Sequence, residues 1–312
     1  MFSQKAHQVR RSYSEGDRVY VKSKEEILES LGSDNKKDGC LFMEGMFSFC
    51  GQPQQIIKTV RHFFDEYRFR LYKTKATLYI LKGSICDGTD ESFDRQCDRS
   101  CYYLWHEDWL TDAPSSVPSR ENANHAKILR TPTKGAISSV QEIPFCQLTN
   151  ISDVARRNSW LNDILQIRTK VLRTLKRALR AQWNRMARKL SSPISAEYLK
   201  KDIPEPIREG DIVRVKSQGE ILQLLDDRST YKRLFFIHEM YEFCNKEYQV
   251  LKVIDSFYDE AKKKMARCKN TVMLEGVTCS GRQRLYMAAC DRQCFFFWHR
   301  DWLDKVQSSK SP

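Results

Sequence analysis

The cysteine residues of this chain form two groups with the same spacing. Each group follows the pattern C-x10-C-x3-C-x4-H, without an insertion or deletion between the two copies. Thiolate and imidazole are ligands that zinc prefers, and several of them close in sequence are typical of a tetrahedral site. The spacing therefore predicts a zinc site, with iron as the alternative metal. The candidate ligands are Cys86, Cys97, Cys101 and His106 in the first group and Cys279, Cys290, Cys294 and His299 in the second.

Three further cysteines bear on this prediction. Cys50 and Cys244 lie at matching positions upstream of the two groups, and Cys146 follows the first group as a candidate ligand for it. The prediction is weaker for the second group than for the first, and weakest for the two histidines. The alternative is that these thiols are small buried hydrophobic residues, since free cysteine is among the most buried residue types.

These residues lie in a segment that the chain contains twice, at residues 15–112 and 209–305. The copies open on E-G-D-R-V-Y-V-K-S and E-G-D-I-V-R-V-K-S, and they close on W-H-E-D-W-L and W-H-R-D-W-L. A repeat of this length indicates two copies of one domain rather than a solenoid unit. Tails at 1–14 and 306–312 and a connector at 113–208 complete the expected organisation.

Each copy carries the pattern of a small, mainly β domain with some helix. Valines alternate after Gly-Asp, as in a strand with one buried face, and Ser23 or Ser217 can then cap a short helix. Further strands are expected at 56–64 and 78–81, and at 250–258 and 272–274. Short strands at close spacing favour a fold of two tandem SH3-like small β-barrels joined by a long basic helix.

Tryptophans flank the histidine at the end of each copy. Trp105 and Trp109, like Trp298 and Trp302, are four residues apart and share a face at helical spacing. Core packing is the favoured interpretation, and a ligand-stacking platform is the alternative. Asp108 and its counterpart in the second copy can orient the histidine as second-shell carboxylates do.

The excess positive charge is concentrated between the copies. The formal net charge is +13 for the chain, of which +11 falls in residues 113–208, with −4 in 15–112 and +2 in 209–305. No apolar run is long enough to span a bilayer, and the N-terminus lacks the apolar centre of a secretory signal. A flexible tail is favoured there over an organelle-targeting peptide. We therefore expect a cytoplasmic protein with reduced thiols.

Apolar residues recur at three- and four-residue steps over 153–190, which predicts an amphipathic helix. Residues 168–189 hold nine basic residues and no acidic one. Ser191, Ser192 and Pro193 end the pattern. The residues that we expect to bind a partner are Arg168, Lys170, Arg173, Lys176, Arg177, Arg180, Arg185 and Arg188.

Three interpretations of this helix remain open. The first is that its apolar stripe packs on one or both modules and its basic face is solvated. The second is an anionic membrane surface, which tryptophans and arginines favour. The third is nucleic acid bound through its phosphates, although no nucleic-acid fingerprint is present.

The chain resembles an uncharacterised bacterial family in which a G-D-x-V-x-V module, an arginine-rich middle helix and a second such module follow one another. The resemblance runs through G-D-R-V-Y-V, M-F-S-F-C-G, C-D-R-S-C, F-C-Q-L-T, V-T-C-S-G and both W-H-x-D-W-L ends, so it covers nearly the whole chain. It implies the domain plan and no particular activity. The family often keeps fewer cysteines in the second module, where this chain has Cys294, and often has a histidine between the first two cysteines, which this chain lacks.

The sequence favours a non-catalytic accessory or adaptor protein, stabilised by zinc, that docks a partner, most simply a protein, through its basic helix. A metalloenzyme with a cysteine-ligated metal is the alternative. Such an enzyme needs an open metal position or a base adjacent to the metal. A protein that binds nucleic acid or an anionic membrane is the third possibility. No nucleophile motif or phosphate loop accompanies the cysteines, so catalysis ranks lower.

Overall fold

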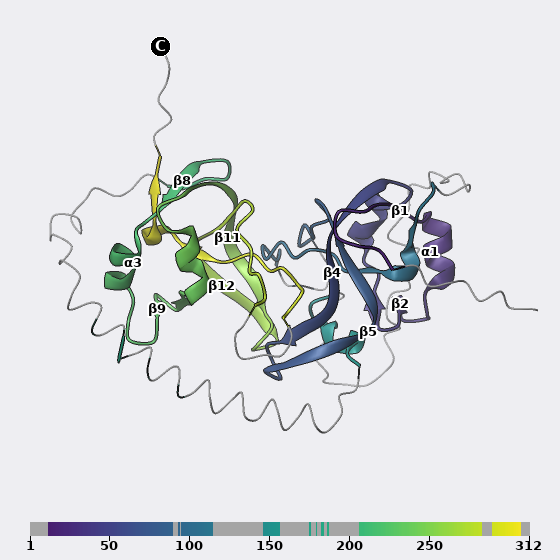
Figure 1. Cartoon of the computed structure of the whole chain (residues 1–312), viewed down its shortest axis with the longest axis horizontal. Coiled ribbons are helices and arrows are strands. Elements are labelled where there is room, and N and C mark those ends of the chain that lie inside the picture. Colours follow the sequence, from purple (N-terminus) through teal and green to yellow (C-terminus); the bar gives the residue numbers. More distant parts are fainter. Residues whose placement is uncertain are drawn as a thin grey trace, which may run out of the picture. The chain divides into compact units, whose positions relative to one another are not determined.

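The protein is mainly β (Figure 1). The computed structural model describes residues 12–89, 93, 95–114, 146–156, 206–282 and 289–306, together with residues 175, 179, 182, 183 and 186. Within these residues lie two five-stranded antiparallel sheets and a few short helices. The expectation of a mainly β chain with some helix is therefore confirmed.

The contacts divide the chain into two units that are not the two halves of the sequence. The first unit holds residues 1–63, 73–86 and 102–156, and the second holds residues 64–72, 87–101 and 157–312. Two segments of the first sequence copy, namely the tip of a hairpin and the loop with Cys97 and Cys101, thus belong to the second unit. This division differs from the linear boundaries expected from the repeat.

The first sheet has the strand order β6-β5-β4-β1-β7. A small ladder of β2 and β3 and several short helices accompany it. The elements are β1 (Arg18–Val21), α1 (Lys24–Ser30), β2 (Lys36–Lys37), β3 (Cys40–Leu41), η1 (Glu44–Phe49), β4 (Pro53–Asp65), β5 (Arg70–Leu81), β6 (Trp105–His106), η2 (Glu107–Trp109), β7 (Leu110–Thr111) and η4 (Ile151–Val154).

The second sheet has the equivalent strand order, β13-β12-β11-β8-β14, with a small ladder of β9 and β10. Its registers match those of the first sheet: Val213 pairs with Tyr248 as Val19 pairs with Gln54. The elements are β8 (Ile212–Val215), α3 (Gln218–Leu224), β9 (Thr230–Tyr231), β10 (Leu234–Phe235), η6 (His238–Phe243), β11 (Glu247–Asp259), β12 (Lys264–Leu274), β13 (Trp298–His299), η7 (Arg300–Trp302) and β14 (Leu303–Lys305).

Both predicted helix caps are confirmed. The Ser23 hydroxyl accepts a hydrogen bond from the Glu26 amide, and the Glu26 carboxylate accepts one from the Ser23 amide. Ser217 and Glu220 form the same reciprocal pair at the start of α3. Such a capping box satisfies amide groups that have no partner within the helix, so the matched S-x-x-E sequences fix where both helices begin.

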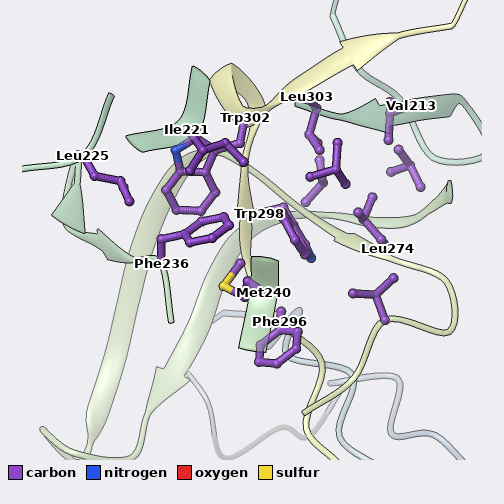
Figure 2. Packing of buried hydrophobic residues seen from close by; sticks show 14 residues of the cluster. Val213, Ile221, Leu225, Phe236, Met240, Leu274, Phe296, Trp298, Trp302 and Leu303 are labelled. Atoms are coloured by element: carbon purple, nitrogen blue, oxygen red, sulfur yellow. The ribbon is translucent and has the colours of Figure 1, made fainter. Parts of the chain in front are cut away.

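The tryptophans belong to the cores, as the favoured interpretation predicted. Trp105, Trp109, Trp298 and Trp302 are fully buried. In the second unit, Phe236 makes edge-to-face contacts with both Trp298 and Trp302, and Met240 lies beside them (Figure 2). Edge-to-face pairs add to the stabilisation that burial of these rings provides.

The hairpin strands are longer than the sequence predicts. The patterns indicated 56–64 and 250–258, whereas β4 and β11 extend over Pro53–Asp65 and Glu247–Asp259. The W-H-x-D-W-L ends each form a short strand, a 3-10 turn and a second short strand. Among the described strands no pairing closes either sheet into a barrel, so the SH3-like assignment stays a prediction.

Residues 146–156, expected in the connector, pack in the first unit. The buried Gln147 amide donates to the carbonyls of Leu41 and Leu104 at 2.7 and 2.9 Å, and its oxygen accepts from the Leu104 amide at 2.8 Å. Ile151–Val154 is a 3-10 turn, and Ala155 bridges Thr74. The predicted start of the basic helix at residue 153 is therefore wrong, because this segment is held by β5 and by the Lys36–Asp153 ion pair at 2.7 Å.

Candidate functional sites

Two loops with the sequences C-D-R-S-C and C-D-R-Q-C lie in the second unit, at residues 97–101 and 290–294. Each is closed in the same way, because Cys97 donates its amide to the Gly88 carbonyl and Cys290 donates to the Gly281 carbonyl. Both glycines have a positive φ, and a Cβ on either would collide with the carbonyl of the bonded cysteine. Glycine at these two matched positions therefore shapes both loops.

The loop at residues 97–101 is anchored on β11 by Asp98. One carboxylate oxygen accepts hydrogen bonds from the amides of Asp255 and Ser256, both at 3.1 Å, and the other pairs with Lys252 at 3.3 Å. The Asp98 amide in turn donates to the Ser256 carbonyl at 2.8 Å. The register of β11 against β12 shifts between Ile254 and Ser256, and such a bulge frees amides from the ladder for the carboxylate.

Two cysteine sulfurs accept hydrogen bonds from backbone amides at equivalent positions. The Tyr258 amide lies 3.4 Å from Cys97 Sγ, and the Phe64 amide lies 3.3 Å from Cys290 Sγ. Phe64 and Tyr258 occupy the same place in the two sequence copies, as do the two cysteines. Each sulfur is therefore held against the hairpin tip of the other copy, within the second unit.

A buried ion pair lies beside these sulfurs. The Arg292 guanidinium donates two hydrogen bonds to the Glu260 carboxylate, at 3.0 and 2.9 Å, and also lies 3.7 Å from Cys294 Sγ. Two parallel bonds of this kind are the strongest geometry for such a pair. Burial lowers the pKa of Arg292, but the charge of the Glu260 carboxylate and its hydrogen bonds to the guanidinium raise that pKa above its ordinary value, so the guanidinium stays charged.

Arg99, the counterpart of Arg292, sits in the same cluster. It donates to the Tyr258 carbonyl at 3.1 Å and lies 3.4 Å from Glu66 and 3.9 Å from Glu260. The Glu66 amide donates to the Glu260 carboxylate at 3.3 Å. The sequence reasoning missed this cluster, although the shared C-D-R triplet was its signal.

Burial keeps several candidate ligand thiols protonated. It raises the pKa of Cys50 and of Cys279 to about 12, and the pKa of Cys244 to about 11. Burial also raises the pKa of Cys290. Zinc binds the thiolate, so metal binding at these residues has to release protons.

The structure brings some predicted ligands together. The Cys279 amide donates a hydrogen bond to the Cys294 carbonyl at 2.8 Å, and the neighbouring Cys294 and Cys290 add to the effect of burial in raising the pKa of Cys279. Cys279 Sγ also lies 3.7 Å from the Glu239 carboxylate. In the part of the chain that the structure describes, however, no group of three or more His, Cys, Asp or Glu side chains is arranged to hold a metal ion.

The first group of predicted ligands is divided between the units. Cys50, Cys86 and Cys146 belong to the first unit, and Cys97 and Cys101 belong to the second. Cys146 lies in a turn in which its carbonyl accepts from the Thr149 hydroxyl and the Asn150 side chain. The zinc prediction for both groups therefore continues to rest on the sequence spacing.

The two histidines serve the backbone inside the cores. His106 Nδ1 accepts a hydrogen bond from the Asp108 amide and so caps η2, while Nε2 lies 3.1 Å from Asp38. His299 Nδ1 accepts from the Asp301 amide in the same way. Burial lowers the pKa of both rings. This geometry favours a structural role over metal ligation, because one nitrogen of each ring is already used.

The two cores differ in how they treat the indole N–H groups. Trp105 donates to the Ser84 hydroxyl at 2.8 Å, and Trp109 donates to the Ser30 hydroxyl at 3.1 Å. The second copy has Val277 and Leu224 at the positions of these serines. Among the described residues, the buried Nε1 atoms of Trp298 and Trp302 have no hydrogen-bond partner.

Most of the predicted basic helix lies outside the described residues, including every basic residue proposed to bind a partner. Residues 175, 179, 182, 183 and 186 are described, and all five are helical and exposed. Four of them are large and apolar, and their exposed fractions are 58% for Leu175, 64% for Leu179, 67% for Trp183 and 54% for Met186. We call these four residues the apolar stripe. They are not part of either hydrophobic core.

No protein-family model, no curated protein and no solved structure matches this chain. The described helices include none with the length and apolar content needed to cross a bilayer.

Proposed function

We propose that this protein is a non-catalytic docking protein of the cytoplasm. Two SH3-like modules rich in cysteine and tryptophan form its body, and the basic helix within residues 157–190 binds a polyanionic partner. The exposure of the apolar stripe supports this proposal more than any other observation. Large exposed apolar groups mark interaction sites when they are contiguous, and these four lie in the segment that carries most of the positive charge.

The remainder of the molecule is consistent with a structural body. The matched tryptophans, histidines and capping serines all act in packing or in backbone hydrogen bonds. The buried Arg292–Glu260 pair and the Asp98 anchor hold loops in place. These are the roles expected of polar groups that stabilise a scaffold.

Zinc is part of this proposal, as a brace for the modules. The cysteines that would hold it are Cys86, Cys97, Cys101, Cys50 and Cys146 in the first copy, and Cys279, Cys290, Cys294 and Cys244 in the second. Glu239 is an additional donor beside Cys279. A bound zinc would neutralise thiolates that burial otherwise disfavours.

The docking function is tested by binding of the full-length protein to polyanions. Anionic vesicles, duplex RNA and an acidic peptide are each titrated with the wild type and with a Leu175→Gln/Leu179→Gln variant. Glutamine preserves helix propensity and charge, so a loss of binding is assigned to the stripe. We expect stripe-dependent binding to one of the three. Equal binding by both proteins, or binding to none, contradicts a docking helix.

A further inference from the structure

Resting on that proposed function, we infer that the partner of the helix is the surface of an anionic lipid bilayer. The apolar stripe is the feature that selects lipid. Its four residues are each more than half exposed. They follow one another at steps of four, four and three residues along described helical positions.

These spacings place the stripe on one face. At about 100° per residue, the four side chains fall within an arc of about 80° on an α-helix. Lys176, Arg177, Arg180 and Arg185 lie between them in the sequence, further basic residues precede and follow, and no acidic residue interrupts residues 168–189. A narrow apolar face within a sequence rich in lysine and arginine is the pattern of helices that lie in the plane of a membrane interface.

An anionic bilayer can bind both the apolar stripe and the basic residues, whereas phosphate groups alone can bind only the basic residues. Nucleic acid would pair with the basic residues but leave Leu175, Leu179 and Met186 in water. A bilayer takes those side chains below its headgroups while anionic headgroups pair with the cations. Trp183 fits the same site, because tryptophan concentrates where headgroups meet the hydrocarbon. The helix therefore lies on the surface of the bilayer and does not cross it. Among the described residues, no helix is long and apolar enough to cross a membrane.

The test uses the full-length protein and two kinds of vesicle. One contains phosphatidylcholine only, and the other contains equal parts of phosphatidylcholine and phosphatidylglycerol. We expect sedimentation with the anionic vesicles, weakened by salt, and a blue shift of tryptophan emission on binding. The emission is read in a Trp160→Phe background, because Trp160 lies in the same segment. In that background the Trp183→Phe change should remove most of the shift, since Trp105, Trp109, Trp298 and Trp302 are already buried.

The stripe is tested by the Leu175→Gln/Leu179→Gln variant. Each replaced leucine removes apolar surface that would be buried in the lipid, so we expect the affinity of the variant for the anionic vesicles to be about tenfold lower or more. The matched control is Phe235→Ser, which removes an exposed apolar side chain (63% exposed) outside the helix. This control should bind as the wild type does. Both variants should keep the wild-type unfolding midpoint, because the altered side chains are exposed.

The outcomes separate the lipid inference from the docking function. Stripe-dependent binding to duplex RNA or to the acidic peptide, without binding to anionic vesicles, overturns the lipid inference and leaves the docking function in place. No binding to any polyanion overturns both. Equal binding by wild type and stripe variant to the anionic vesicles also overturns the inference, because a charge-only contact does not need the stripe.

Discussion

The buried Arg292–Glu260 pair gives the most discriminating prediction about stability. The change is Glu260→Gln, which keeps the volume of the side chain and removes its charge. Glu260 is 5% exposed and Arg292 is 7% exposed. Both hydrogen bonds between them are 3.0 Å or shorter. The substitution leaves the guanidinium charged in a site that excludes water.

The magnitude follows from the burial of the partner that remains. Removing one member of a buried ion pair costs about 3–5 kcal/mol. The glutamine oxygen still accepts one bond, so we expect about 3 kcal/mol, which is about a hundredfold in the unfolding equilibrium. The matched control is Glu66→Gln, at the equivalent position of the first copy. The Glu66 side chain is 41% exposed and its carboxylate lies 3.4 Å from Arg99, so loss of its charge should cost about 1 kcal/mol or less.

Urea denaturation measures the global effect, and hydrogen exchange of peptides covering β11 and β12 locates it. The double variant Glu260→Gln/Arg292→Met also removes the Arg292 charge and keeps an acceptor for the Glu66 amide, and it should be much more stable than Glu260→Gln alone. Equal and small effects for Glu260→Gln and Glu66→Gln would falsify the idea that this pair is a desolvated anchor. A double variant as unstable as the single one would show that packing, and not an uncompensated charge, sets the cost.

Three further predictions concern the cores and the cysteines. Val277→Thr should destabilise the protein less than Val215→Thr, because the new threonine hydroxyl at position 277 can accept a hydrogen bond from the unpaired Trp298 N–H. The free energies of unfolding of the two variants, measured by urea denaturation, should differ by about 1 kcal/mol. Equal losses would count against this assignment. Since burial lowers the pKa of His106, the unfolded chain takes up a proton first as the pH falls below about 6.5, so stability should decrease there. The unfolding midpoint of His106→Asn, which can still cap η2, should depend less on pH over that range, and an unchanged slope would refute the role. Elemental analysis of the purified protein should find zinc, and the zinc content should be lower in the Cys97→Ser and Cys101→Ser variants. Metal uptake should release protons. A metal-free native protein, with both variants as stable as the wild type, would end the zinc proposal.

Local signals in the sequence were sufficient for much of the fold. The alternating valines after Gly-Asp predicted β1 and β8 because one face of each strand is buried. The S-x-x-E sequences predicted both helix starts because the cap is formed within four residues. Burial of the tryptophans followed from their size and spacing. Each of these depends on neighbours in sequence.

The candidate sites were predictable only in part, because their contacts span the chain. The amides that bind Asp98 lie 157 and 158 residues away from it, and no local pattern identifies the bulge that frees them. The sequence marked Arg99 and Arg292 as shared but not Glu260 as their partner. The role of Gln147 was also hidden, because its acceptors in β3 and before β6 are distant in sequence.

The loop at residues 97–101 has a consequence for how the protein is made. Its amide donors, Asp255, Ser256 and Tyr258, lie more than 150 residues downstream. Domains usually fold as units, N-terminal first, during synthesis. Here the ribosome must translate β11 before the loop at residues 97–101 can form its hydrogen bonds to the bulge of that strand. The nascent chain therefore carries an unanchored loop with two thiols while residues 102–255 are made, and a chain that terminates before residue 255 cannot anchor this loop.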